Sequence, residues 1–177
     1  IRLSLVGSEM CIRDSNEAAG GRFVAIASGG SIAVYSNNGT DWNTFNMPSV
    51  GEWKCIASGN NRFVAIRRNS NIAASSLNGF TWTSRSMPSS REWNSVTFGG
   101  GIFVAVAGDA DAGAFSTNGT TWTATTLPDI GDSTVNEWVD ITYGRRTFVA
   151  LSNSGNFVAT GTYDSGTNTI SWIGRTI

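Results

Sequence analysis

The chain has 177 residues, of which 40% are hydrophobic and 14% charged, and its formal net charge is −1. This length predicts one domain, and the near-zero charge provides neither the basic surface that binds nucleic acid nor a polybasic segment for membranes. No apolar run approaches the roughly 20 residues of a membrane helix. From the charge and this absence together, we expect no nucleic-acid partner and no membrane insertion.

Histidine is absent from the sequence, which excludes Ser-His-Asp triads, Cys-His pairs and metal sites built on imidazole. The two cysteines are Cys11 and Cys55. Cys55 falls in a predicted strand, where we interpret it as a small buried hydrophobic residue. We therefore expect no metal, no cofactor and no catalytic residue, and so a protein that is not an enzyme.

Residues 1–16 do not match the rest of the chain. The run from Leu3 to Ser15 resembles a translated sequencing adapter of the kind found in reading frames from environmental assemblies. A signal peptide is the alternative, but its apolar part would end at Val6 and Glu9 follows. We therefore predict a non-native or disordered segment over 1–16, which leaves the first repeat without its first strand.

Aromatic landmarks recur every 40 residues after this segment, and a fourth copy follows with insertions. A fixed period of this size is typical of repeat architectures. The landmarks are Phe23, Phe63, Phe103 and Phe148 in one position, Trp53, Trp93 and Trp138 in a second, and Trp42, Trp82, Trp122 and Trp172 in a third.

Each repeat predicts four short strands, which we name a to d. Strand a begins at the second landmark, and strand b begins at the first, as in Phe23-Val24-Ala25-Ile26. Strand b is apolar at consecutive positions, so we expect neighbouring sheets to cover both of its faces. In the first three repeats a Met-Pro or Leu-Pro pair follows strand d, and we expect the proline to end that outer strand.

The motif Ser-x-Asn-Gly-x-x-Trp separates strands c and d, and a loosened version at 164–168 stands in the fourth repeat. Asn-Gly predicts a type I′ hairpin turn, in which both central residues have positive φ. We expect the serine hydroxyl to bond backbone groups of the turn while the tryptophan, on strand d, covers it. These structural residues are Ser36, Asn38, Gly39, Trp42, Ser76, Asn78, Gly79, Trp82, Ser116, Asn118, Gly119 and Trp122.

These features predict an all-β fold, a β-propeller-like array of about four antiparallel blades of four strands each. An open β-solenoid or a sandwich is the alternative. We expect the repeats over 17–177, with blades at about 17–50, 51–90, 91–135 and 136–177. Because neither end supplies a strand that would close a ring, we expect a fragment of a larger propeller.

The motif resembles a shortened Asp-box, the turn repeated in sialidase-type (BNR), photosystem II assembly-factor-like and sortilin-like propellers. The family pattern Ser-x-Asp-x-Gly-x-x-Trp has one more residue, and an aspartate where Asn38, Asn78 and Asn118 stand. The resemblance covers 20–177, and its nearest variants are those of phage tail and bacterial surface proteins. It implies a structural role for the box, on the side away from the functional face, and an extracellular or virion-surface location.

Candidate ligand-binding residues lie in the b–c loops and the d–a links, where the repeats differ most. Because strand direction alternates, both sets of loops should lie at one edge of each blade, opposite the Asn-Gly turns. Glu52, Glu92 and Glu137 precede the strand-a tryptophan and would ring the mouth of the channel, or bond neighbouring backbone N–H groups. The other candidates are Arg67, Arg68, Arg91, Asp109, Asp111, Asp129 and Asp132.

The sequence offers two other candidate sites. Asp109-Ala110-Asp111-Ala112-Gly113 begins like a calcium loop but lacks the later glutamate, so a plain b–c turn is the alternative. Paired carboxylates for glycoside hydrolysis could come from this loop, from Asp129 or Asp132, or from Asp140, although solvated loop carboxylates are the commoner case.

We therefore predict a non-enzymatic recognition module that binds a glycan or a protein through the loop face. Its host could be a phage tail or cell-surface protein. The alternatives are a truncated sialidase-like glycoside hydrolase propeller and a structural spacer.

Overall fold

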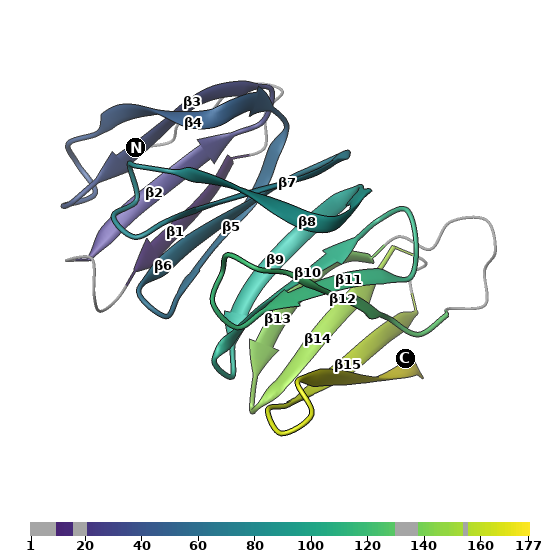
Figure 1. Ribbon diagram of the computed structural model, residues 1–177. Helices are drawn as coiled ribbons and strands as arrows, with labels where there is room; N and C mark the ends of the chain where they lie inside the picture. Colours follow the sequence, from purple (N-terminus) through teal and green to yellow (C-terminus); the bar gives the residue numbers. More distant parts are fainter. Residues whose placement is uncertain (1–9, 16–20, 130–137, 154–155) are drawn as a thin grey trace.

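The structure is a computed structural model, which describes residues 10–15, 21–129, 138–153 and 156–177. The described chain forms four antiparallel sheets of four strands each, consecutive in sequence within every sheet (Figure 1). The strands are β1 (Met10–Ser15), β2 (Arg22–Ala27), β3 (Gly30–Ser36), β4 (Asn43–Gly51), β5 (Trp53–Gly59), β6 (Arg62–Arg67), β7 (Ser70–Ser76), β8 (Thr83–Arg91), β9 (Trp93–Gly99), β10 (Ile102–Ala107), β11 (Ala112–Ser116), β12 (Thr123–Thr126), β13 (Trp138–Gly144), β14 (Thr147–Ser152), β15 (Phe157–Asp164) and β16 (Thr169–Thr176).

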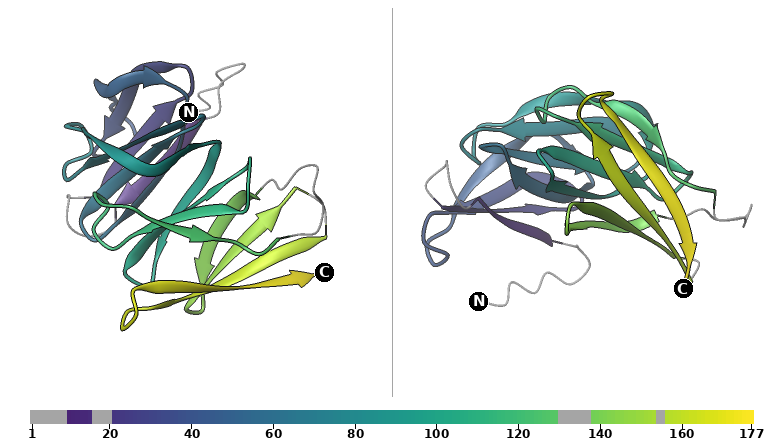
Figure 2. Two further views of the ribbon diagram at one scale, coloured as in Figure 1. Left: turned by 45° about the vertical axis from the view of Figure 1, so that its right-hand side comes forward. Right: turned by 90° about the horizontal axis from the view of Figure 1, so that it is seen from below.

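The sheets stack face to face and follow an arc, with the first strand of each sheet on the inside (Figure 2). Inner strands β1, β5, β9 and β13 contact one another in series. Three hydrophobic clusters fill the spaces between successive sheets. This arrangement confirms the predicted all-β, propeller-like class, and the described residues include no helix that could cross a membrane.

Strand β1 corrects the prediction that the first repeat lacks its inner strand. Met10–Ser15 pairs antiparallel with β2, from Met10 opposite Ala27 to Ser15 opposite Arg22. The repeat comparison missed this strand because it compared side chains, whereas a β-ladder is made by main-chain groups that every residue except proline supplies. The pairing concerns the backbone of 10–15 and not the origin of the segment 1–16.

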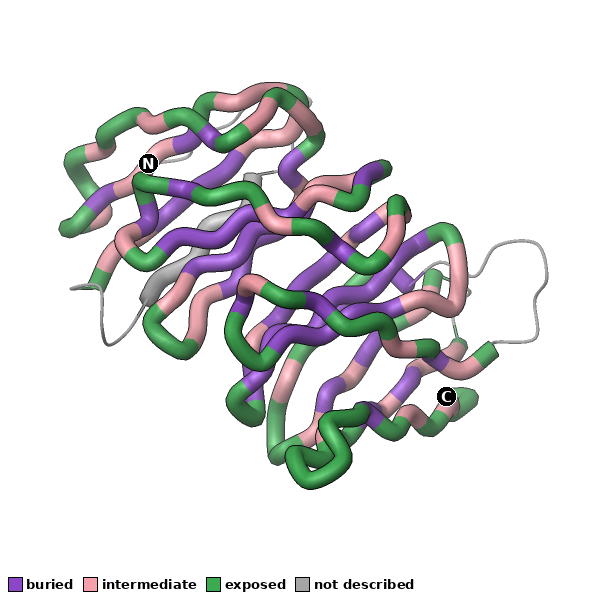
Figure 3. Tube along the Cα trace, viewed as in Figure 1, coloured by how far each residue is buried: buried purple, intermediate pink, exposed green. Residues whose placement is uncertain are grey.

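The second strands of the sheets are the most deeply buried elements, as their consecutive apolar residues predicted. Every residue of β10 is buried, as are the four apolar residues of β6. Figure 3 shows this buried centre, with exposed residues gathered at turns and outer strands. In the outermost sheets β2 and β14 are partly uncovered, because each of these sheets has a described neighbour on one face only.

The Asn-Gly turns differ from the type I′ prediction. Only the glycines have positive φ (Gly39 78°, Gly79 80°, Gly119 68°), and Leu77–Trp82 forms a six-residue loop between β7 and β8. Type I′ geometry occurs instead at the a–b turns, where both central residues have positive φ, as at Asn60 (47°) and Asn61 (57°). The Asn-Gly loop is too long for a two-residue hairpin and needs side chains to hold it.

Serine and asparagine of the motif supply those bonds. The Ser76 hydroxyl accepts from the backbone N–H groups of Asn78 (3.2 Å) and Gly79 (2.8 Å), and it donates to Asn78 Oδ1. Asn78 Oδ1 also accepts from the backbone N–H groups of Phe80 (3.1 Å) and Thr81 (2.8 Å). The loops at 36–41 and 116–121 repeat this network, so the motif has the structural role that was predicted.

The motif glycine also lies close to the preceding sheet. A Cβ atom on Gly79 would come within 2.8 Å of the Val24 side chain, and one on Gly119 within 2.7 Å of the Arg62 side chain. Glycine is therefore required twice, for its positive φ and for this contact. The Asn-Gly loop consequently joins neighbouring sheets as well as neighbouring strands.

The motif tryptophans are not equivalent, contrary to the prediction that all three are largely buried. Trp82 and Trp122 are 9% and 8% exposed, whereas Trp42 is half-buried. Trp82 stacks on Phe45 of the preceding sheet, with ring centroids 6.2 Å apart. Trp42 belongs to the first sheet and has no described sheet on that side. All three stand just before strand d rather than within it.

The prolines lie inside the outer strands instead of ending them. β4 continues through Pro48 to Gly51, and β8 continues through Pro88 to Arg91. The register with the adjacent strand shifts at these places. An edge strand tolerates proline because one side of its ladder is unpaired. In the third sheet β12 ends before Leu127-Pro128, as predicted.

Candidate functional site

The b–c loops and d–a links meet at one edge of the sheets, as strand alternation predicted. The backbone N–H of Arg68, in a b–c loop, donates to the carbonyl of Glu52 at 2.9 Å. In the next sheet the N–H of Gly108 donates to the carbonyl of Glu92 at 2.8 Å. These bonds fix each b–c loop against the link that enters its sheet, and we call this side the loop edge.

The two glutamates therefore act in part through their main chain. We had expected their carboxylates to bond neighbouring backbone N–H groups, but the repeated acceptor is the carbonyl oxygen. Their side chains differ: Glu52 Oε2 accepts from the Asn69 amide at 3.3 Å, and Glu92 pairs with Arg68. A main-chain role leaves each carboxylate available for a contact particular to its sheet.

Four of the predicted residues come together where the second sheet meets the third. Arg68 of the β6–β7 loop forms an ion pair with Glu92, which enters the third sheet. Arg91 Nη1 lies 3.8 Å from Asp109 Oδ2 of the β10–β11 loop. The side chains of Arg68, Arg91 and Asp109 are 38%, 39% and 37% exposed, although the Nε atoms of both arginines are buried and have no hydrogen-bond partner among the described residues. We call Arg68, Arg91, Glu92 and Asp109 the ionic junction.

Arg67 lies at the neighbouring junction, between the first and second sheets. Its Nη1 is 3.3 Å from the Ser49 hydroxyl, and its side chain covers Gly51, where a Cβ atom would come within 2.2 Å of Nε. Arg67 is thus packed along the end of β4. It belongs to the loop edge but not to the ionic junction.

Lys54 follows the buried Trp53 on the inner strand of the second sheet. Burial lowers the pKa of its ammonium group, and the nearby positive charge of Arg68 lowers it further. Arg68 therefore influences both the loop edge and the inner strand. We had not singled out Lys54 from the sequence, because a lysine in a strand carries no signal of its own.

Other predicted residues are scattered. Asp111 precedes β11, and its carbonyl accepts from the Leu127 N–H at 3.0 Å. Gly113 lies within β11 and not in a turn, so the sequence 109–113 does not form the sharp bend of a calcium loop. No group of three or more acidic or cysteine side chains gathers among the residues that the structure describes. Asp129 is exposed beyond β12, whereas Asp132 and Glu137 lie outside the described residues.

Asp140 is a strand residue rather than a loop carboxylate. It lies on β13, and its Oδ1 accepts from the Ser95 hydroxyl of β9 at 2.6 Å and from the Ile141 N–H at 2.9 Å. Ser95 and Asp140 occupy the same repeat position as Cys55, which is buried as predicted. This position joins neighbouring inner strands.

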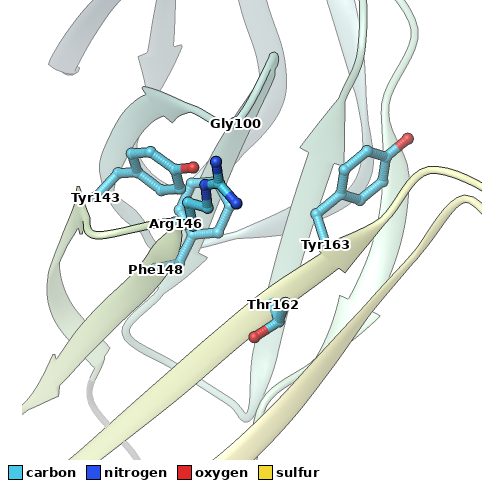
Figure 4. Close-up of a pocket in the computed structure, with 6 residues that line it drawn as sticks. All are labelled: Gly100, Tyr143, Arg146, Phe148, Thr162 and Tyr163. Atoms are coloured by element: carbon cyan, nitrogen blue, oxygen red, sulfur yellow. The ribbon is translucent and has the colours of Figure 1, made fainter.

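A hollow of about 350 Å³ lies at the opposite edge, which carries the a–b and c–d turns and which we call the turn edge (Figure 4). Sequence reasoning missed it, because we expected this side to be purely structural. A signal was present in Arg145-Arg146, two arginines where earlier repeats have Asn60-Asn61 and Gly100-Gly101. The lining residues are Gly100, Tyr143, Arg146, Phe148, Thr162 and Tyr163.

Comparisons with known proteins support the fold. No protein-family model and no curated protein matches the sequence. Virginiamycin B lyase from Staphylococcus aureus superposes with a TM-score of 0.74 and 14% identity, over 92% of this chain and 54% of the lyase chain. YCF48 from Cyanidioschyzon merolae gives 0.64 and 16%, over 96% and 57% of the two chains.

A third structure, YCF48 bound to D1 peptide, gives a TM-score of 0.59 and 14% identity, over 91% of this chain and 50% of that one. The chain thus spans about half the length of these three structures. At such identities the likeness shows the fold alone, and the narrower resemblance to Asp-box propellers rests on the sequence motif. The chain has the architecture of a β-propeller, in four blades.

Proposed function

We propose that this protein is a non-enzymatic recognition module that binds a polypeptide segment at the loop edge. The observation that carries the proposal is the ionic junction, where three separate chain segments bring two arginines and two carboxylates together. Loops held on a rigid scaffold are common binding elements. The backbone bonds of Arg68 and Gly108 supply that rigidity here.

The charges of the junction favour a partner with charges of both signs. The junction holds two pairs of opposite charges, Arg68 with Glu92 and Arg91 with Asp109, and three of these side chains are more than a third exposed. Complementary charges at an accessible surface set the specificity and register of a partner more than its raw affinity. A peptide that carries both acidic and basic side chains matches these charges. One structural neighbour is described as bound to a peptide, which gives the fold a precedent.

The surroundings of Asp140 argue against its use in glycoside hydrolysis. Its Oδ1 accepts from the Ser95 hydroxyl and from the Ile141 backbone N–H. A general acid and a nucleophile would both need to face a substrate. Asp140 instead faces partners within the protein.

Selection from a displayed library of random peptides tests the proposal. Wild type is expected to enrich peptides of mixed charge, with affinity that falls as salt rises. Arg68→Asn with Arg91→Asn should abolish the enrichment. The control is Arg145→Asn, which removes a positive charge from the turn edge and should leave the enrichment unchanged.

Three outcomes would refute a polypeptide ligand at the loop edge. They are no enrichment by wild type, equal enrichment by the loop-edge variant, and loss of enrichment in the turn-edge control. Thermal melts of both variants show whether each remains folded. A parallel glycan array that binds wild type, while the peptide library does not, would assign the loop edge to sugars instead.

A further inference from the structure

The hollow at the turn edge exists because the fourth sheet departs from the repeat. In the third sheet Phe103 lies opposite Ser116, and the Asn-Gly loop then begins. In the fourth sheet Phe148 lies opposite Gly161, and β15 continues to Asp164 instead. Thr162 and Tyr163 therefore stand where the third sheet has Thr117 and Asn118. The loop whose glycine contacts the preceding sheet elsewhere is replaced by a longer hairpin.

Aromatic rings wall this hollow and are held in place. The ring centroids of Tyr143 and Phe148 lie 4.7 Å apart with their planes at 52°. Tyr143 also lies on Gly99, where a Cβ atom would come within 2.0 Å of its ring. On the other side Tyr163 packs against Phe115 at 5.9 Å, and its hydroxyl donates to Asn168 Oδ1 at 2.9 Å. The rings are thus positioned before any ligand arrives.

Arg146 reaches this hollow from the β13–β14 turn (Figure 4). Its guanidinium is exposed, and within the described chain it forms no hydrogen bond or ion pair. Arg145 and Arg146 have φ of 50° and 64°, the region that favours glycine and asparagine. Backbone strain of this kind occurs at binding sites, where the side chain rather than the turn is needed.

We propose that this hollow binds a small free molecule in which a carboxylate is joined to a flat apolar group. The volume of about 350 Å³ suits a small molecule rather than the surface of a protein partner. The guanidinium would hold the carboxylate in two parallel hydrogen bonds, and the rings would contact the apolar part. This site is separate from the loop edge and does not depend on the proposed function.

Titration calorimetry of the full chain with trans-cinnamate, compared with trans-cinnamamide, tests the proposal. The two probes have nearly the same shape, but only cinnamate carries a charge. We expect cinnamate to bind at least about tenfold more tightly, since a charge-assisted pair is stronger than a neutral hydrogen bond. Equal affinities of the two probes, or no binding of cinnamate, would overturn the proposal.

Two matched variants locate the site. Arg146→Asn and Arg145→Asn each remove one positive charge and each place a residue suited to positive φ in the same turn. Arg146→Asn is expected to weaken cinnamate binding at least about tenfold, whereas Arg145→Asn should change it by less than about twofold. Equal losses in both variants would show a diffuse charge effect and contradict the assignment to Arg146.

Two further measurements test whether the ligand binds in the hollow and whether it is a free acid. Tyr163→Ser removes one ring of the hollow without changing charge, and it should weaken cinnamate binding at least about tenfold while the protein remains folded. Unchanged cinnamate binding by this variant would place the ligand elsewhere. Acetyl-Ala-Phe with a free C-terminus carries the same chemistry on a peptide, and tighter binding of this probe than of cinnamate would overturn the assignment to a free acid.

Discussion

Arg68 and Glu92 form an ion pair across the junction between the second and third sheets, with side chains that are 38% and 22% exposed. A pair of this exposure contributes only about 0.5–1 kcal/mol. A double-mutant cycle of Arg68→Gln and Glu92→Gln in urea is expected to give a coupling free energy in this range, reduced at high salt. A coupling near zero at low salt would show that the pair does not join the two sheets.

Replacing the loop asparagines by aspartate is expected to affect the free energy of unfolding differently at positions 78 and 38. At 78 the carboxylate would still accept from the backbone N–H groups of Phe80 and Thr81, and the Thr81 hydroxyl could donate to it. At 38 the amide donates to Asp41 Oδ2 at 2.7 Å, so an aspartate would place two carboxylates together.

We therefore expect Asn78→Asp to change the free energy of unfolding by less than about 0.5 kcal/mol, and Asn38→Asp to lower it by about 1 kcal/mol. The loss in Asn38→Asp should shrink at high salt, because ions screen the repulsion between the two exposed carboxylates. Urea unfolding at two salt concentrations measures both effects. An equal effect of the two substitutions would contradict the hydrogen-bond assignment.

The motif tryptophans should differ in their contribution to stability. Trp82→Ala and Trp122→Ala each remove a buried ring and are expected to cost about 3–5 kcal/mol. Trp42→Ala removes a half-buried ring and should cost less, about 1–2 kcal/mol. Chemical unfolding of the three variants checks this order. Equal losses would mean that another surface covers Trp42 in solution.

Strand β1 predicts that the N-terminal segment contributes to stability. Deleting 1–16 removes the ladder from Met10 to Ser15 and leaves the edge of β2 unpaired. We expect a fall of several degrees in melting temperature and a tendency to aggregate, because a bare strand edge pairs with other chains. Deleting 1–9 alone is the control, since it keeps β1. Identical melting of the 1–16 deletion and the full chain would show that the ladder adds no stability.

The repeats explain how much of the fold could be predicted from the sequence. Equivalent aromatics such as Phe63 and Phe103 revealed the strands, and the alternation of strand direction placed the loops that carry Arg68 and Glu92 at the same edge of the sheets. Both predictions depend on local pattern and connectivity. The pairing of β1 could not be predicted in this way, because main-chain bonding leaves no trace in side-chain identity.

The parts of the site that sequence reasoning missed arise from departures from the pattern. The turn geometry of the Asn-Gly loop depends on the hydrogen bonds that Ser76 and Asn78 make to the backbone. The Asn-Gly dipeptide alone does not predict these bonds. The hollow depends on the extension of β15, a change in one sheet only. Repeats therefore predicted what the sheets share, and the structure was needed for what distinguishes the fourth sheet.

Amide chemical-shift mapping with a peptide selected by the wild-type protein tests the central claim most directly. A peptide bound at the loop edge should shift the amides of 67–70, 89–92 and 108–111 most strongly. These segments carry the ionic junction and the loops bonded to it. Shifts that concentrate instead at the Asn-Gly loops or at 143–146 and 162–168 would contradict recognition through the loop edge.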